Sequence, residues 1–154
     1  MQPAVWNPPV RLSPQEAAIV RRIRRAKLFV FLREQRHALF DAAFQQELAA
    51  TYQDSPLGQP PVPPAQLALA LLLEAYTGVS DDEVIDAAIM DRRWQLVLDC
   101  LDANRPPFSK GTLVTFRDRL EDLANGCKAL SREIQCGPAE STARLKGVAE
   151  REEP

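Results

Sequence analysis

The chain has 154 residues, of which 45% are hydrophobic and 26% are charged, and its formal net charge at pH 7 is −2. This composition is ordinary for a soluble globular protein, and the length allows one domain with a real core plus tails. The longest apolar run, residues 67–73, is too short for a membrane span of about 20 residues, and the N-terminus carries no secretion signal.

Residues 1–12 contain three prolines, so we expect an extended leader there. The tetrapeptide Ser13-Pro14-Gln15-Glu16 predicts a helix start, because Ser13 can cap, Pro14 suits the first helical turn and Glu16 can close a capping box. We expect a single helix from there to about Arg36. Its apolar positions follow a helical spacing: Ile19, Ile23, Ala26 and Val30.

Basic residues are concentrated in this first helix. Residues 1–40 carry a net charge of +6, and four arginines and one lysine lie within residues 21–27. Arginine at this density can neutralise phosphates and release counterions, so we predict DNA contacts here. The predicted residues are Arg21, Arg22, Arg25, Arg33 and Arg36. The alternative is that these arginines form a solvated face that pairs with the acidic middle of the chain, since residues 41–104 carry a net charge of −9.

A second amphipathic stretch, residues 38–52, completes a helical region over residues 13–53. The next segment, DSPLGQPPVPP at residues 54–64, contains five prolines and one glycine. No helix or central strand tolerates this density of proline, so we predict a stiff, extended connector.

Residues 65–124 are predicted to form a helical domain. A helix over residues 65–77 is apolar nearly all round and should be buried, and Gly78 should end it in a left-handed conformation. Ser80 and Glu83 form a second capping box for a helix over residues 81–91. Three acidic residues occupy its first turn, where the helix dipole stabilises negative charge. Their position therefore has a structural explanation.

A further helical segment over residues 91–101 should pack Trp94 inward, and Ser109 should cap a last helix over residues 110–123. This last helix is a candidate recognition helix, because its first turn offers polar side chains of the kind that read base edges. Its candidate DNA contacts are Lys110, Thr112, Thr115, Arg117 and Arg119. The alternative is a plain amphipathic helix with a capped start.

Residues 125–154 are polar and lack an apolar pattern, so we expect a disordered tail. No segment alternates with the period of a strand. The predicted fold class is therefore all-α: a small multi-helix bundle with helix-turn-helix-like elements, a Pro-rich connector and a disordered C-terminal tail.

The sequence offers no recognisable catalytic, metal or cofactor site. Cys100, Cys127 and Cys136 stand far apart, and His37 is the only histidine, so a tetrahedral zinc site lacks ligands at suitable spacing. The phosphate-binding pattern GxxxxGK[ST] is missing. The carboxylates gather at helix starts. We therefore predict no catalytic residue, no metal ligand and no cofactor.

Two segments together resemble a known family. They are GQPPVPPAQLALALLLEAYTGVSDDEVIDAAIMDRRWQLVLDCL, residues 58–101, and PPFSKGTLVTFRDRL, residues 106–120. The shared features, in order, are a Pro-rich entry, a leucine-rich helix ending in tyrosine and glycine, an Arg-Trp helix and a closing Phe-Arg helix. This pattern resembles the N-terminal helical domain of bacterial DDE-type insertion-sequence transposases, and the similarity covers roughly residues 39–123.

The resemblance implies a cytoplasmic, nucleoid-associated bacterial protein that contacts DNA at the element ends. In that family the helical region precedes a ribonuclease-H-like domain that carries three acidic metal ligands. Since those acids would lie beyond residue 154, we expect a truncated transposase that has a DNA-binding or assembly role and no strand-cleaving activity. The alternative is a helical protein-interaction module that self-associates or regulates a full-length transposase. An inert pseudogene product is a third possibility.

Overall fold

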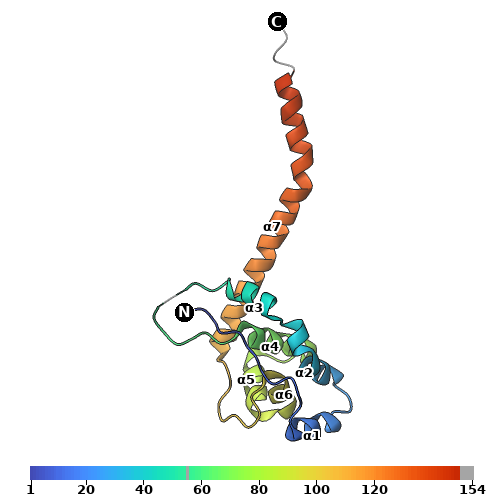
Figure 1. Ribbon diagram of the computed structural model, residues 1–154, viewed down its shortest axis with the longest axis vertical. Helices are drawn as coiled ribbons and strands as arrows, with labels where there is room; N and C mark the ends of the chain where they lie inside the picture. The colour runs from blue at the N-terminus through green and yellow to red at the C-terminus, as the bar shows by residue number, and fades with distance from the viewer. Residues whose placement is uncertain (55, 150–154) are drawn as a thin grey trace. The chain divides into compact units, whose positions relative to one another are not determined.

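The computed structural model describes residues 1–54 and 56–149, and side chains up to Arg132. This part of the chain is all-α and contains no strand, which confirms the predicted fold class. It folds into seven helices (Figure 1): α1 (Pro14–Arg22), α2 (Lys27–Leu39), α3 (Ala42–Ala49), α4 (Pro64–Thr77), α5 (Asp81–Met90), α6 (Arg92–Leu98) and α7 (Lys110–Ala149). The chain divides into one compact unit over Met1–Arg117 and a second that begins at Asp118.

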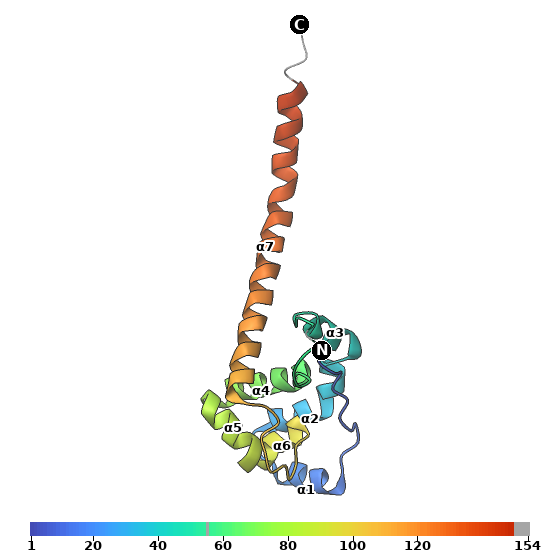
Figure 2. The same ribbon diagram turned by 90° about the vertical axis from the view of Figure 1, so that its left-hand side faces the viewer.

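Helix α6 is the centre of the first unit. It packs against α1, α2, α4 and α5, and both views of the ribbon show it among these helices (Figure 2). Trp94 is 2% exposed, and the ring of Phe29 from α2 meets its ring edge to face at 6.3 Å. The second half of α6 is buried because its apolar residues are consecutive: Leu96, Val97 and Leu98 are fully buried, whereas Arg92 and Arg93 at its start are exposed.

The predicted starts of α1 and α5 and the predicted end of α4 are confirmed. The amide of Glu16 donates to the Ser13 hydroxyl at 3.1 Å, and the amide of Ser13 donates to the Glu16 carboxylate at 2.7 Å, which completes the capping box of α1. Gly78 ends α4 with φ of 72°, a conformation that costs glycine little. Ser80 and Glu83 form the second capping box, at the start of α5.

The single helix expected from Pro14 to Arg36 is instead two helices. α1 ends at Arg22, Ile23 adopts an extended conformation, and α2 begins at Lys27. On a straight helix with 3.6 residues per turn, Ile19 and Ile23 would lie on a different face from Phe29 and Leu32. All four side chains are buried in the folded unit, and the break at residues 23–26 makes this possible. Tertiary burial here overrides a continuous local helix pattern.

The middle of the first unit follows the expected order with small differences. The helix expected over residues 38–52 is shorter, because Asp41 caps α3 and α3 ends at Ala49. Residues 56–63 form neither helix nor strand, as expected of a connector, and residue 55 lies outside the described residues. In α4, Leu67, Leu69 and Leu73 are fully buried, but Leu72 is 47% exposed. The expectation of a helix buried nearly all round is therefore wrong for one face of α4.

Helix α7 differs most from the sequence prediction. It was expected to end near Leu123 and to be followed by a disordered tail, but it continues to Ala149. Residues 150–154 of the predicted tail lie outside the described residues. Ala, Leu, Arg, Lys, Glu and Gln, which have high intrinsic helix propensity, recur beyond Leu123, although Gly126, Gly137 and Pro138 oppose a helix there. The prediction also overlooked that the apolar spacing of three and four residues continues from Leu123 to Cys127 and Leu130.

Candidate nucleic-acid interface

The arginines predicted to contact DNA fall into two groups in the folded unit. Arg21, Arg22 and Arg25 are exposed, at the end of α1 and in the turn before α2. Arg33 and Arg36, in α2, are each only 1% exposed. The two groups therefore meet different partners and are described separately.

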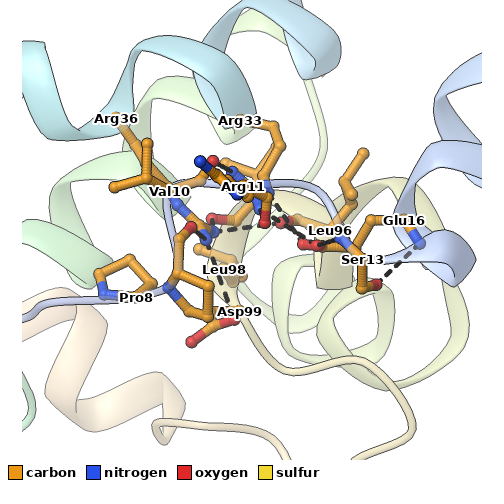
Figure 3. A network of polar contacts seen from close by, with 12 residues as sticks. Pro8, Val10, Arg11, Ser13, Glu16, Arg33, Arg36, Leu96, Leu98 and Asp99 are labelled. Carbon is orange, nitrogen blue, oxygen red and sulfur yellow. Dashed lines mark hydrogen bonds and ion pairs between the residues drawn. The ribbon is translucent and has the colours of Figure 1, made fainter.

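Arg33 is held in a buried ion pair with Glu16 (Figure 3). Its Nε donates to Glu16 Oε1 at 2.8 Å, and its Nη2 donates to Oε2 at 3.1 Å. The same guanidinium also donates to the backbone carbonyls of Val10, at 3.2 Å, and Arg11, at 3.1 Å. Burial alone would raise the pKa of Glu16, but the hydrogen bonds from Arg33 and from the Ser13 amide outweigh it, and the pKa is lowered.

Arg36 binds backbone carbonyl groups at the end of α6. Its Nη1 donates to Leu96 at 3.3 Å and to Val97 at 3.0 Å, and its Nη2 donates to Pro9 at 3.0 Å. The last carbonyls of a helix have no partner within the helix and attract positive charge. Asp99 lies 3.9 Å from Nη2. Burial, together with the charge of Arg33, lowers the pKa of Arg36 to about 10.

The N-terminal leader is fixed by these and neighbouring contacts. The side chain of Gln45 accepts a hydrogen bond from the Trp6 amide at 2.7 Å and donates to the Trp6 carbonyl at 3.0 Å. The Arg36 guanidinium lies over the Trp6 ring at 5.3 Å, and His37 Nε2 is 2.6 Å from the Pro8 carbonyl. The prediction that Arg33 and Arg36 contact DNA is therefore wrong, because both guanidinium groups hold the leader and α6 inside the fold.

The basic residues at the start of α7 also have partners within the first unit. Lys110 Nζ lies 2.8 Å from Asp82, and Arg117 Nη2 lies 2.8 Å from Glu74 and 2.5 Å from Asp81. The hydrogen bond to Asp81 is the main cause that raises the pKa of Arg117, and it lowers the pKa of Asp81. Burial raises the pKa of Glu74 more than the charge of Arg117 lowers it. Lys110 and Arg117 thus pair with carboxylates of the acidic middle of the chain, a pairing that was considered from the sequence only for the arginines of the first helix.

The other three positions of α7 that were predicted to contact DNA are Thr112, Thr115 and Arg119. The Ser109 hydroxyl accepts from the Thr112 amide at 3.2 Å and lies 2.9 Å from the Thr112 hydroxyl, so Thr112 belongs to the helix cap. Thr115 is exposed, and Arg119, which falls in the second unit, is half-buried. Most of the positive charge on the proposed recognition helix is thus already compensated by carboxylates.

The exposed arginine cluster, which we define as Arg21, Arg22, Arg24 and Arg25, has a different character. No side chain of these four arginines forms an ion pair or a hydrogen bond within the described ranges. Lys27, beside them, donates to the Ile23 carbonyl at 2.8 Å. A group of cations without internal partners leaves its positive charge available to an external anion.

Two arginines of α6, Arg92 and Arg93, border this cluster and were not predicted as site residues. Arg93 Nη2 lies 2.6 Å from the carboxylate of Asp91, and the guanidinium lies over the Phe29 ring at 4.9 Å. Arg92 Nη2 lies 3.7 Å from Asp102. In the sequence, Arg92 and Arg93 stand out only as two adjacent arginines within an otherwise acidic segment. Their spacing from residues 21–25 could not predict that the two groups lie side by side.

Within the part of the chain that the structure describes, no group of three or more His, Cys, Asp or Glu side chains is arranged to hold a metal ion. Cys100 and Cys127 are free thiols, and the side chain of Cys136 lies outside the described ones. Burial, with the nearby charge of Asp99, raises the pKa of the Cys100 thiol to about 11, so this thiol stays protonated at neutral pH. Among the described residues, no helix combines the length and apolar character needed to span a membrane.

Comparison with known proteins gives one match. Residues 19–119, about two thirds of the chain, match a family model described as Transposase domain (DUF772). No curated protein and no solved structure shows detectable similarity to the chain. The matched region runs from the last residues of α1 through α6 to the start of α7, and it contains both the buried and the exposed arginines.

Proposed function

The chain belongs to the transposase domain (DUF772) family, and from this premise we propose that it is a DNA-binding and assembly region that acts in DNA transposition. The exposed arginine cluster at the end of α1 and in the α1–α2 turn would supply the main contact with the phosphate backbone. The contact would be electrostatic and largely independent of base sequence.

The observation that carries this proposal is the absence of internal counter-charges around the cluster. Within the described residues, Lys110, Arg33 and Arg117 each pair with a carboxylate, whereas Arg21, Arg22, Arg24 and Arg25 do not. An exposed guanidinium without a partner keeps its full charge and its fork of donors, which suit phosphate oxygens. Four such groups on one short segment favour a polyanionic partner.

We further propose that this chain does not cleave or join DNA strands itself. Strand chemistry of the DDE type needs carboxylates that are free to hold divalent metal ions. In this chain Glu16, Asp81 and Asp82 are each engaged by a basic side chain. The check is a supercoiled-plasmid assay with Mg²⁺ or Mn²⁺. Nicking by the purified chain that disappears with a chelator would contradict this part of the proposal.

The DNA-binding proposal is tested by gel retardation of a duplex across a series of salt concentrations. We expect retardation at low salt that weakens steeply as salt rises, because counterion release drives the binding. The charge reversal Arg21→Glu, Arg22→Glu, Arg25→Glu should abolish the shift for every sequence tested. A matched triple reversal at exposed positions away from the cluster, Arg11→Glu, Arg105→Glu and Lys128→Glu, controls for the change in net charge. Absence of retardation of the wild type at low salt would exclude the proposal.

A second candidate function, self-association or pairing with a full-length transposase, is favoured by one feature of α7. Leu123 is 44% exposed, Leu130 is 60% exposed and Cys127 between them is exposed. Together with earlier positions they follow an alternating spacing of three and four residues, which is the spacing of a coiled-coil seam. The positions available to a partner are Leu120, Leu123, Cys127 and Leu130, whereas Leu113 and Phe116, which continue the spacing toward the helix start, are buried within the first unit.

Light scattering coupled to size exclusion tests this second candidate. A chain that self-associates through this seam should elute as an oligomer, and Leu123→Gln with Leu130→Gln should make it monomeric. In a separate variant, Cys100→Ser, Cys136→Ser with both leucines retained, mild oxidation should form a disulfide between the Cys127 side chains of two chains if the seam is parallel. A monomer at every concentration, with no interaction with a full-length transposase, would exclude this function.

A further inference from the structure

A pocket lies between the α1–α2 segment and the start of α6, with a volume of about 290 Å³. Its apolar wall comes from Ile19, Ile23 and Ala26. Five arginines from two parts of the chain that are far apart in sequence also line it, namely Arg22, Arg24, Arg25, Arg92 and Arg93. Five arginines around one hollow are unusual, since like charges repel one another at short range.

The charge around this pocket is only partly compensated. Asp91 pairs with Arg93, and Asp102 pairs with Arg92, so two carboxylates stand against five guanidinium groups. Arg22, Arg24 and Arg25 have no carboxylate partner within the described ranges. An anion in the hollow would remove the repulsion among these groups and satisfy their free N–H donors. The pocket therefore has the electrostatics of an oxyanion site.

One of the five arginines, Arg93, is held in place by the fold. Asp91 accepts hydrogen bonds from both the Arg93 amide, at 2.9 Å, and the Arg93 Nε, at 3.1 Å, while the guanidinium is supported by the Phe29 ring. The carboxylate that caps α6 thus also orients an arginine of the pocket. Preorganised donors lose less entropy when a ligand binds, so this wall favours a compact anion with several oxygen acceptors.

We infer that this pocket binds one phosphate group, and that it favours a terminal phosphate monoester over an internal phosphodiester of the DNA backbone. The preference has two physical causes. A terminal phosphate protrudes from its carrier and can enter a hollow, whereas an internal diester is flanked by sugars on both sides. A monoester also carries a charge of about −1.5 to −2 at pH 7, against −1 for a diester, which matters more beside several guanidinium groups.

The chemistry fits a phosphorylated DNA end or a free phosphorylated molecule. For the DNA end, the inference rests on the proposed function, and it adds a specific position on the DNA to an otherwise sequence-independent contact. The exposed cluster would contact both the terminal phosphate, through Arg22, Arg24 and Arg25, and the flanking backbone, while Arg92 and Arg93 would act only on the terminal group.

The test uses the full chain and two forms of one blunt duplex, with a 5′-phosphate or a 5′-hydroxyl, in fluorescence anisotropy at fixed salt. We expect the phosphorylated duplex to bind roughly tenfold more tightly, the size of one charge-assisted interaction. The variant Arg24→Gln, Arg92→Gln should lose most of this preference. The control Arg11→Gln, Arg105→Gln removes two exposed arginines outside the pocket and should keep it.

Calorimetric titration with inorganic phosphate and with a nucleoside monophosphate identifies the other source. Binding of either compound that the Arg24→Gln, Arg92→Gln variant loses supports the phosphate pocket even if no duplex binds, and the proposed function would then fail alone. Equal affinity for the two duplexes, with no binding of free phosphate compounds, would overturn the inference and leave the proposed DNA contact standing.

Discussion

The exposed cluster at residues 21–25 and the buried pair Arg33 and Arg36 come from one basic stretch of sequence, yet the fold uses them in opposite ways. Arg33 and Arg36 lie on the face of α2 that also buries Phe29 and Leu32, and they bind Glu16 and backbone carbonyls. The cluster lies where the chain leaves α1, and its side chains have no internal partner among the described residues. Arginine content alone therefore does not identify a DNA-binding surface; the availability of each charge does.

The largest expected effect comes from the buried side of this comparison. Glu16→Gln keeps the shape of the side chain but leaves the charge of Arg33 buried without a counter-charge, so we expect the free energy of unfolding to fall by about 3–5 kcal/mol. Urea denaturation followed by circular dichroism measures it. Glu34→Gln, at an exposed position of α2, is the matched control and should change little. An unchanged stability of Glu16→Gln would mean that the pair is not structural.

Acid should weaken the same pair. Because the pKa of Glu16 in the folded chain is below its ordinary value of 4.5, the ion pair contributes its full stability above pH 4.5 and loses it as the pH falls below that value. The pKa of Glu74 is raised, so protonation of this carboxylate as the pH falls favours the folded state and partly offsets the loss. Thermal unfolding between pH 7 and pH 3 should therefore show a smaller loss of stability for Glu16→Gln than for the wild type. Parallel curves for the two proteins would contradict this assignment.

An intermediate effect is expected at Arg117, whose side chain is 32% exposed between Glu74 and Asp81. Arg117→Met should lower the free energy of unfolding by about 1–2 kcal/mol, less than a fully buried pair because water screens the charges. Arg105→Met, at an exposed position, serves as the control. DNA affinity should stay close to that of the wild type. A loss of DNA binding as large as that caused by changes in the exposed cluster would show that Arg117 of α7 contacts the DNA.

The smallest effect on stability is expected in the exposed cluster. Arg21→Gln, Arg22→Gln, Arg25→Gln should change the free energy of unfolding by no more than about 0.5 kcal/mol per site, because these side chains make no polar contact with the described residues that would be lost. Chemical denaturation measures this. An unfolded triple variant would show that these arginines are structural, like Arg33.

Local signals in the sequence predicted the fold well. The capping boxes at Ser13 and Ser80 and the stop at Gly78 depend on residues within a few positions of one another, and all three are found where expected. The break between α1 and α2 could not be predicted, since it results from burying Ile23 and Phe29 on different faces. The full length of α7 was missed because the apolar spacing was taken to end at Leu123, although it continues through Cys127 and Leu130.

The candidate site was less predictable than the fold. The basic stretch could be recognised from composition, but the division between Arg25 and Arg33 depends on which face of α2 meets α6. Arg92 and Arg93 join the site only through tertiary packing that brings α6 beside the end of α1. A single sequence holds no local signal that would predict this packing of α6 beside the end of α1.

The salt dependence of DNA binding tests the central claim most directly. The logarithm of the association constant should fall linearly with the logarithm of the salt concentration, and the slope counts the phosphates neutralised, at about 0.9 per contact for duplex DNA. For Arg21→Gln, Arg22→Gln, Arg25→Gln we predict a folded protein whose slope is smaller than that of the wild type by roughly 2–3, as expected when about three phosphate contacts are lost. Equal slopes for a folded variant and the wild type would contradict the claim that these exposed arginines hold the DNA.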